Sequence, residues 1–187
     1  MRRIKKSMSQ AVPIYQIDFH DVRAPLDAVI GEEGKGHRVI YGLIDGERII
    51  LGAKGVGVGQ AALDIALGYS LERKQFGQPI LDFQAVSQMI GDMAIEIEVA
   101  RTMTHKAAWL RGEGVPHSHE AAIAKVFGSE VGTRCVARGM RVLAGRSLFS
   151  DYGLERLNRE SRIYEFGGGT NEVLRELIVR SLRRDVA

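Results

Sequence analysis

The stretch between residues 83 and 110 repeats apolar side chains at intervals of three and four. An α-helix has 3.6 residues per turn, so such a repeat places those side chains on one face. A face of this length has to be buried against other elements. The sequence therefore predicts a long amphipathic helix from an N-cap at Asp82 to about Arg111. Its apolar face consists of Phe83, Val86, Ile90, Met93, Ile97, Ala100, Met103, Ala107 and Leu110.

Helical patterns continue on both sides of this stretch. Residues 35–73 form one long pattern before it, and after a break at residues 112–116 another runs over residues 118–143. A short helix is expected over residues 153–161 and a last one over residues 171–184. Long helices with short connections lie antiparallel to their sequence neighbours. The predicted fold is therefore mainly α, an antiparallel four-helix bundle.

The N-terminal part follows a different pattern. Residues 14–22 alternate imperfectly between polar and apolar side chains, and prolines bound them, which indicates a strand. Residues 1–12 are basic and contain no acid, and we interpret them as a loop and a strand. We expect a short β segment over residues 1–34 and a helical domain over residues 35–187.

The first long helical pattern is unusually rich in small residues. Its glycines between residues 55 and 59 do not form a nucleotide-binding loop, because no strand precedes them and their spacing does not match. Each glycine inside a helix costs about 1 kcal/mol relative to alanine. The thin face must therefore allow close helix contact or leave room for a ligand. The small residues are Gly52, Ala53, Gly55, Gly57, Gly59, Ala61 and Ala62.

Composition excludes several classes of function. Hydrophobic residues make up 45% and charged residues 26% of the 187 positions, which is ordinary for a globular domain. The formal charge is +3 and the basic residues are spread along the helices, so we expect no nucleic-acid partner. No apolar run of about 18 residues stands out, so we expect no membrane span.

Cysteine and histidine usage argues against disulfide and metal chemistry. The single cysteine, Cys135, excludes an intramolecular disulfide and is expected in or near the core. His117 and His119 lie at a helix entrance, where such histidines are more often solvated than bound to a metal, so no metal site is expected.

A glycine-rich turn leads into the last predicted helix. It reads IYEFGGGTNEV over residues 163–173, and Thr170 is a good N-cap. Two segments accompany it: ERKQFGQPI over residues 72–80, and DFHDVRAP from residue 18 followed by GEEGKG from residue 31. In this order and spacing they resemble the flavin-dependent acyl-CoA dehydrogenases. The resemblance covers residues 14–184 and only the back half of that family's fold, so residues 1–34 would be a remnant of its middle β-domain.

The resemblance implies an enzyme that removes hydrogen from an acyl-CoA. In the family, a glutamate takes the α-proton while the β-hydrogen leaves as hydride to FAD. That glutamate often sits in the last loop, where this chain has Gly168. In isovaleryl- and long-chain acyl-CoA dehydrogenases it comes from the first bundle helix, where this chain has Glu47. We expect Glu47 to be the base, with Arg48 and Gly168 beside the substrate. Glu165 is a competing candidate, and a solvated Glu47 paired with Arg48 is the non-catalytic alternative.

The resemblance also implies residues that bind FAD. Arg73 would pair with the pyrophosphate of a neighbouring subunit's FAD, because guanidinium geometry suits two oxygens, and Phe76 would pack near the adenine. Gln84 matches a position near this site. Thr170 and Glu172 match residues on the phosphate and ribose side of the flavin, where a ribose hydroxyl or the helix N-terminus suits Glu172 better than a phosphate.

Two positions depart from the family pattern. Arg141 replaces the usual glutamine, and Ala144-Gly145 replaces a glycine pair. We still expect Arg141 and Gly145 at the adenosine side of FAD. The arginine would either strengthen a phosphate contact or mark altered cofactor binding.

The partners follow from the same resemblance. They are an acyl-CoA substrate, electron-transfer flavoprotein as acceptor, and a second copy in a homodimer or homotetramer. The missing front half would come from a partner chain, or the chain is a partial gene product or an engineered domain. The expected location is cytoplasmic, or the mitochondrial matrix in a eukaryote. A non-catalytic helical assembly module is the alternative function, and a relative of flavin monooxygenases or acyl-CoA oxidases is a third.

Overall fold

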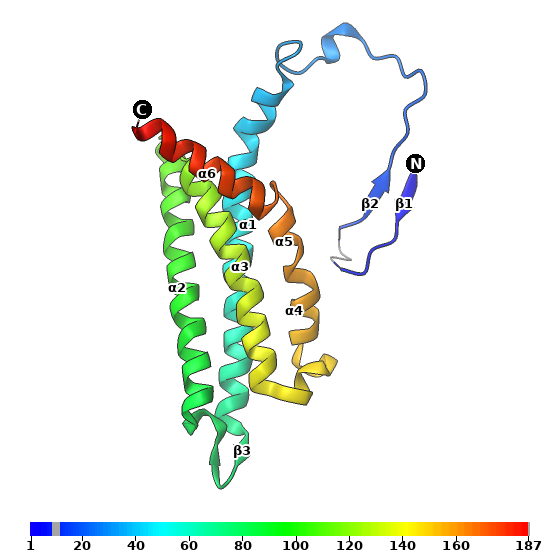
Figure 1. Cartoon of the computed structure of the whole chain (residues 1–187). Helices are drawn as coiled ribbons and strands as arrows, with labels where there is room; N and C mark the ends of the chain where they lie inside the picture. Colours follow the sequence, from blue (N-terminus) through cyan, green and yellow to red (C-terminus); the bar gives the residue numbers. More distant parts are fainter. Residues whose placement is uncertain (9–11, 187) are drawn as a thin grey trace.

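The computed structural model of the chain describes residues 1–8 and 12–186. Within these residues, three long helices run side by side and alternate in direction (Figure 1). They are α1 (Gly36–Glu72), α2 (Gln84–Gly112) and α3 (Ser118–Leu143). The prediction of a mainly α chain built as an antiparallel bundle is confirmed.

The core lies where the three long helices meet. Met93 and Ile97 of α2 pack with Ala62 of α1 and with Val131 and Cys135 of α3. All five side chains are buried, as the apolar repeat of α2 predicts. Burial raises the pKa of the Cys135 thiol to about 11, which identifies it as a core residue rather than a nucleophile.

The small residues of α1 form a close seam with α3. A Cβ atom at Gly52 would lie 2.7 Å from the carbonyl oxygen of Ala124, and one at Gly55 would overlap the carbonyl oxygen of Gly128. The seam is reciprocal, because a Cβ atom at Gly132 of α3 would lie 2.7 Å from the Gly55 oxygen. Of the two alternatives for the thin face, close helix contact is therefore the one observed.

The later helices close the bundle. The chain passes through 3₁₀ turns at Ala144–Leu148 and Ser150–Tyr152 before α4 (Leu154–Ser161). A four-residue helix, α5 (Ile163–Phe166), follows, and α6 (Asn171–Val186) crosses one end of the bundle (Figure 1). Buried leucines anchor both α4 and α6 against α3: these are Leu154 and Leu174.

A small hairpin joins α1 to α2 at the opposite end. Strand β3 (Lys74–Gln75) pairs with β4 (Gln78–Pro79), and the turn residues Phe76 and Gly77 have φ values of 51° and 85°. Positive φ at both central residues is typical of a type I′ turn, which suits the twist of a two-residue hairpin.

The expected N-cap of α2 at Asp82 is wrong. Asp82 ends a 3₁₀ turn over Ile80–Asp82, and Phe83 is the residue at the N-cap. The turn is closed by a 3.2 Å hydrogen bond from the Phe83 amide to the Ile80 oxygen. Because the hairpin leaves through this turn, α2 begins two residues after Asp82.

The N-terminal segment forms a two-stranded ribbon. β1 (Arg2–Ile4) pairs antiparallel with β2 (Ile14–Gln16), in register from Arg2 opposite Gln16 to Ile4 opposite Ile14. The expected strand over residues 14–22 is therefore shorter than predicted, because its partner spans only three residues. A 3₁₀ turn at Leu26–Ala28 precedes α1.

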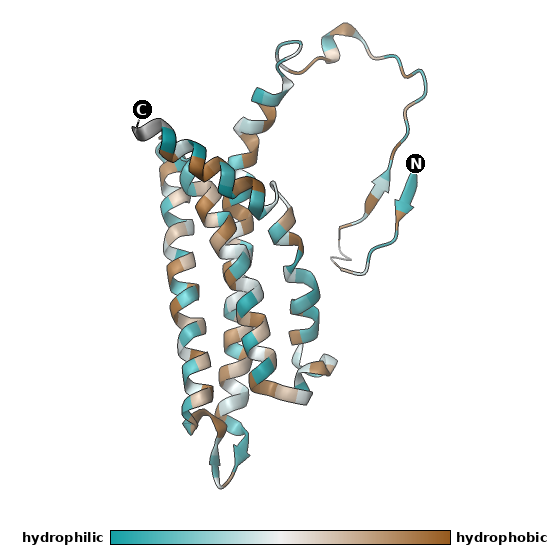
Figure 2. Cartoon of the chain, in the orientation of Figure 1, coloured by the Kyte–Doolittle hydropathy of each residue, from teal (hydrophilic) through white to brown (hydrophobic). Residues whose placement is uncertain are grey.

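Helix α1 is more apolar than the sequence analysis allowed. Its most apolar stretch has a mean hydropathy of 1.3, so by length and composition alone α1 could cross a membrane, and 50% of that stretch is buried inside the structure. Its N-terminal end extends beyond α2 and α3 and carries hydrophobic residues there (Figure 2). Ile40 and Leu43 on this extension are exposed.

Candidate active site

The glycine-rich loop lies across α1 between α5 and α6. Gly168 and Gly169 have φ values of 65° and 97°, a region that side chains with a Cβ atom rarely adopt. A Cβ atom at Gly167 would lie 3.3 Å from Cδ1 of Leu51, so the loop rests closely on the helix. This loop and the facing turn of α1 form the candidate site.

The structure brings Glu47 and Gly168 together. A Cβ atom at Gly168 would lie 4.0 Å from Cδ, the carboxyl carbon, of Glu47. A glutamate at position 168 of the loop and the glutamate at position 47 of α1 would therefore place their side chains next to each other. Glu47 is exposed in this chain, so it faces water unless another part of a larger assembly covers it.

Arg48 is buried under the same loop. Its side chain is 4% exposed, its Nη1 lies 2.7 Å from Oδ1 of Asp45, and its Nε donates a 3.1 Å hydrogen bond to the Gly168 oxygen. Ser118, the first residue of α3, donates to the other carboxylate oxygen of Asp45. Arg48 therefore ties α1 to the loop, and its partner is Asp45 rather than Glu47. Its predicted contact with substrate stays a prediction.

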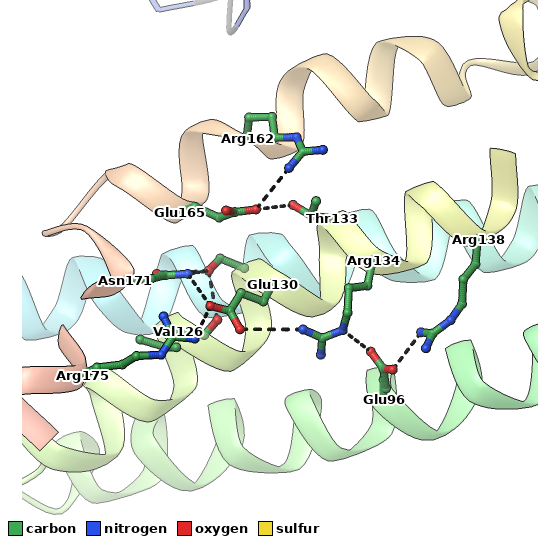
Figure 3. Close-up of polar contacts among 11 residues, drawn as sticks. Glu96, Val126, Glu130, Thr133, Arg134, Arg138, Arg162, Glu165, Asn171 and Arg175 are labelled. Atoms are coloured by element: carbon green, nitrogen blue, oxygen red, sulfur yellow. Dashed lines mark hydrogen bonds and ion pairs between the residues drawn. The ribbon is translucent and has the colours of Figure 1, made fainter. Parts of the chain in front are cut away.

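Glu165, the competing base, is held by other groups. Thr133 Oγ1 of α3 donates a 2.6 Å hydrogen bond to Oε1 of Glu165, and Arg162 lies 3.9 Å from the same oxygen (Figure 3). These contacts point the carboxylate toward α3. Both contacts are made to the same carboxylate oxygen, Oε1.

Lys125 of α3 is the residue that the sequence analysis missed. It is fully buried. Its Nζ donates to the backbone oxygen of Glu165 at 2.9 Å, the backbone oxygen of Gly169 at 2.8 Å and Asn171 Oδ1 at 2.7 Å. Burial lowers the pKa of Lys125 to about 8. A signal was present in the sequence: Lys125 stands four residues after Ala121 and three before Gly128, on the face that turns inward.

A polar network continues from the loop across the bundle. The Asn171 side-chain amide donates to Ser129 at 3.1 Å and to Glu130 at 3.2 Å, and Glu130 also accepts from Arg175 of α6 (Figure 3). Further along α3, arginines contact Glu96 of α2, with distances of 2.8 Å from Arg134 and 2.7 Å from Arg138.

The balance of forces on Glu96 shows how this network holds. Partial burial acts to raise the pKa of the Glu96 carboxyl, but hydrogen bonds from Arg134 and Arg138 outweigh it and leave the pKa lowered. The charged form of Glu96 is thus favoured. The network therefore joins α2, α3 and α6 on one side of the site.

Thr170 and Glu172 begin α6. The Thr170 Oγ1 accepts a 3.4 Å hydrogen bond from the Val173 amide, so the predicted N-cap is present. Glu172 is exposed, and its own backbone amide and then the Thr170 side chain lower its pKa. A carboxylate is favoured at a helix N-terminus, which agrees with the role expected for Glu172.

The remaining candidates lie at the hairpin end of the bundle. Arg73 is exposed at the end of α1 and, with Arg146, Tyr69 and Tyr152, lines a groove of about 460 Å³. Phe76 at the hairpin tip is 93% exposed, and its ring meets Phe83 edge-on with centroids 6.1 Å apart.

Gln84, Arg141 and Gly145 are also exposed at the hairpin end, at the start of α2 and the end of α3. The structure therefore splits the predicted residues into two groups. Glu47 and Arg73 are 26 positions apart on α1, which corresponds to about 39 Å of helix.

Comparison with known proteins identifies the fold family. Residues 34–183 match the family model of the acyl-CoA dehydrogenase C-terminal domain. This chain belongs to the acyl-CoA dehydrogenase family. Among curated relatives, it is 44% identical over 167 residues to the probable acyl-CoA dehydrogenase YngJ of Bacillus subtilis (strain 168), covering 89% of this chain and 44% of YngJ.

Solved protein structures superpose well on the chain. Butyryl-CoA dehydrogenase from Megasphaera elsdenii matches with a TM-score of 0.85 and 37% identity, over 88% of this chain and 43% of that one. PigA with FAD and proline matches with a TM-score of 0.94 and 28% identity, over 97% of this chain and 48% of PigA. The chain thus spans less than half the length of these relatives.

Proposed function

We propose that this chain contributes the catalytic base to an FAD-dependent acyl-CoA dehydrogenase, and that Glu47 is that base. The observation that carries the proposal is the 4.0 Å between the Glu47 carboxyl carbon and a Cβ atom at Gly168. The loop position is a glycine and the adjacent helix position is a glutamate, so one carboxylate is available where the family's reaction needs one.

A base at Glu47 would have to be shielded from water. The α-proton of a thioester is only weakly acidic, so the base must have its pKa raised by exclusion of water. In this chain Glu47 is exposed, so the bound acyl-CoA and the front half of the family fold would have to cover it. The α-proton passes to Glu47 and the β-hydrogen leaves with its electron pair, which creates the α,β double bond. FAD, when bound, supplies the acceptor for that hydride.

The two groups of FAD-binding candidates support an oligomer. Thr170 and Glu172 lie at the loop end, while Arg73 and Phe76 lie at the hairpin end, about 39 Å of helix from Glu47. An exposed guanidinium and an exposed aromatic ring suit a pyrophosphate and an adenine. We therefore propose that the hairpin end of one copy completes the FAD site of another, in a homodimer or homotetramer.

The other partners belong to the same proposal. An acyl-CoA would be the substrate and electron-transfer flavoprotein the acceptor, while residues 1–34 would be the end of a middle β-domain and residues 35–187 the bundle domain. The cytoplasmic or matrix location stays a prediction. These points rest on membership of the family.

Glu47→Gln tests the proposal because it removes the base and keeps the shape. In the enzyme assembled with its front half, we expect acyl-CoA-dependent reduction of an artificial acceptor to fall by about 10²- to 10⁴-fold. Glu98→Gln, at an exposed position of α2, is the matched control and should keep full activity. Full turnover in Glu47→Gln would show that the base lies elsewhere.

A non-catalytic assembly module is the alternative function. It is favoured by the exposure of Glu47 and by large apolar side chains on the outer face of α2, where Ile95, Val99 and Trp109 are exposed. The flavin absorption of the purified assembly separates the two functions. A colourless oligomer that does not oxidise acyl-CoA would support the module.

A further inference from the structure

We propose that Lys125 is a positioning residue that holds the glycine-rich loop against α1, and so places the loop opposite Glu47. The proposal deepens the proposed function, on which its catalytic meaning rests. The structural part, a buried ammonium that organises residues 165–171, concerns this chain alone.

The bonding geometry of Lys125 carries the first step. An ammonium has three N–H donors, and Lys125 has three acceptors within 2.9 Å: the backbone oxygens of Glu165 and Gly169 and the side-chain oxygen of Asn171. These acceptors lie at the end of α5, inside the loop and at the start of α6. One side chain therefore spans the whole loop.

The position of the loop relative to Glu47 carries the second step. The carbonyl of Gly168 accepts from Arg48, and the next carbonyl along the chain, that of Gly169, accepts from Lys125. The loop carbonyls are thus drawn toward two buried cations on α3 and α1. Because Gly168 and Gly169 have positive φ values, the loop could adopt other paths if these bonds were lost.

The surroundings of Lys125 determine whether its side chain is charged. Burial disfavours the charged form of Lys125, as does Arg48, while Glu165, Glu172 and Glu130 favour it. With a pKa of about 8, the side chain carries its proton at neutral pH. Above about pH 8 the side chain becomes an amine with two donors and loses one of its three bonds.

Exchange of the loop amides tests the positioning role on the full chain. Lys125→Met keeps an unbranched apolar stem that is one atom shorter and removes the ammonium with all its donors. We expect hydrogen exchange at the Gly167 amide, which donates to the Ile163 oxygen where the loop begins, to become at least about tenfold faster, since a hydrogen bond to a charged group is worth more than one decade in an equilibrium. Val136→Ala, buried on the same helix and outside the loop, is the control for general destabilisation and should leave this exchange relative to the rest of α3 unchanged.

A pH titration of the unmodified chain gives a second readout that needs no variant. Lys125 has a pKa of about 8 when folded and 10.5 ordinarily, so between these values the folded state binds fewer protons than the unfolded state. The contribution of this group to the free energy of unfolding therefore rises as the pH climbs through that window. Over the same window the resonances of the loop residues should shift, because the Lys125 side chain loses a donor.

The outcomes are distinct from those of the Glu47 test. If the loop amides do not titrate between pH 7 and about 9.5, and exchange in Lys125→Met equals that of the unmodified chain, the positioning role is overturned while the base assignment stands. If Lys125→Met does not fold, the titration alone decides. If Glu47→Gln keeps its activity but the loop responds as expected, the base assignment fails and the loop anchor remains.

Discussion

The two ends of the bundle are built in different ways. At the loop end, charged groups are buried and paired. Arg48 binds Asp45 and the backbone of the loop, and Lys125 binds the loop backbone and the Asn171 side chain. At the hairpin end, Arg73 and Phe76 project from the last turn of α1 and a two-residue turn, and both are exposed.

The difference teaches what each end is for. A buried, paired arrangement fixes geometry within the chain, and removing one of its members leaves another charge unpaired. Exposed groups cost little to carry and contribute little to folding, so they are available to a ligand or to another copy. The chain therefore completes one part of its site and offers another part outward.

The largest stability effect should come from Asp45→Ala at the loop end. It strands the buried guanidinium of Arg48, so we expect a loss of about 3–5 kcal/mol in the free energy of unfolding, measured with denaturant. Asp64→Ala, at an exposed position of the same helix, should change it by less than about 0.5 kcal/mol. Equal effects in the two variants would remove the contrast between the buried ion pair at the loop end and the helix surface.

Gly55→Ala should have the next largest effect and test the seam that both ends share. The added methyl group overlaps the Gly128 carbonyl, and backbone cannot move aside cheaply, so we expect a loss of about 1–3 kcal/mol. Gly57→Ala points into open space and should gain up to about 1 kcal/mol from helix propensity. A stable Gly55→Ala variant would mean that α1 and α3 can separate.

Thr170→Ala should have an intermediate effect. It removes the N-cap of α6, and we expect a loss of about 1 kcal/mol. Thr102→Ala, exposed within α2, is the matched control and should be neutral or slightly stabilising. Thermal unfolding of the three proteins measures the difference, and identical midpoints would show that the loop does not depend on this cap.

The smallest stability effect should come from Arg73→Ala at the hairpin end. We expect a change of less than about 0.5 kcal/mol in the chain alone, because the side chain is exposed. In the assembled enzyme the same variant should retain FAD at least about tenfold less tightly, since it loses a charge-assisted contact. A large loss of stability would show that Arg73 contributes to folding, and that the hairpin end does not differ from the loop end in this respect.

Much of the fold could be predicted because it follows from periodicity. The stripe from Phe83 to Leu110 required a helix partner. The small residues of α1 left two alternatives, close helix contact or room for a ligand, and the structure shows the contact, with α3. The start of α2 could not be predicted, because a 3₁₀ turn after the hairpin took Asp82 away from the cap. The helix and N-cap propensities of single residues do not encode the path by which the preceding hairpin enters α2.

The candidate site was predicted only as far as resemblance reached. Glu47 and Gly168 were paired in the sequence analysis, and the structure places them side by side. Lys125 was missed because its role depends on a loop 40 or more residues away, and a lysine on a helix is usually assigned to solvent. Its place on a face of small residues was the available sign.

Helix α1 has a consequence for how such a chain can change over time. Its 37 residues run without interruption from the loop end to the hairpin end, so it works as a rigid spacer. One residue inserted between Glu47 and Arg73 would rotate one relative to the other by about 100° and shift them by about 1.5 Å. Substitutions on its outer face can accumulate, but insertions and deletions within that interval should be absent from any working descendant.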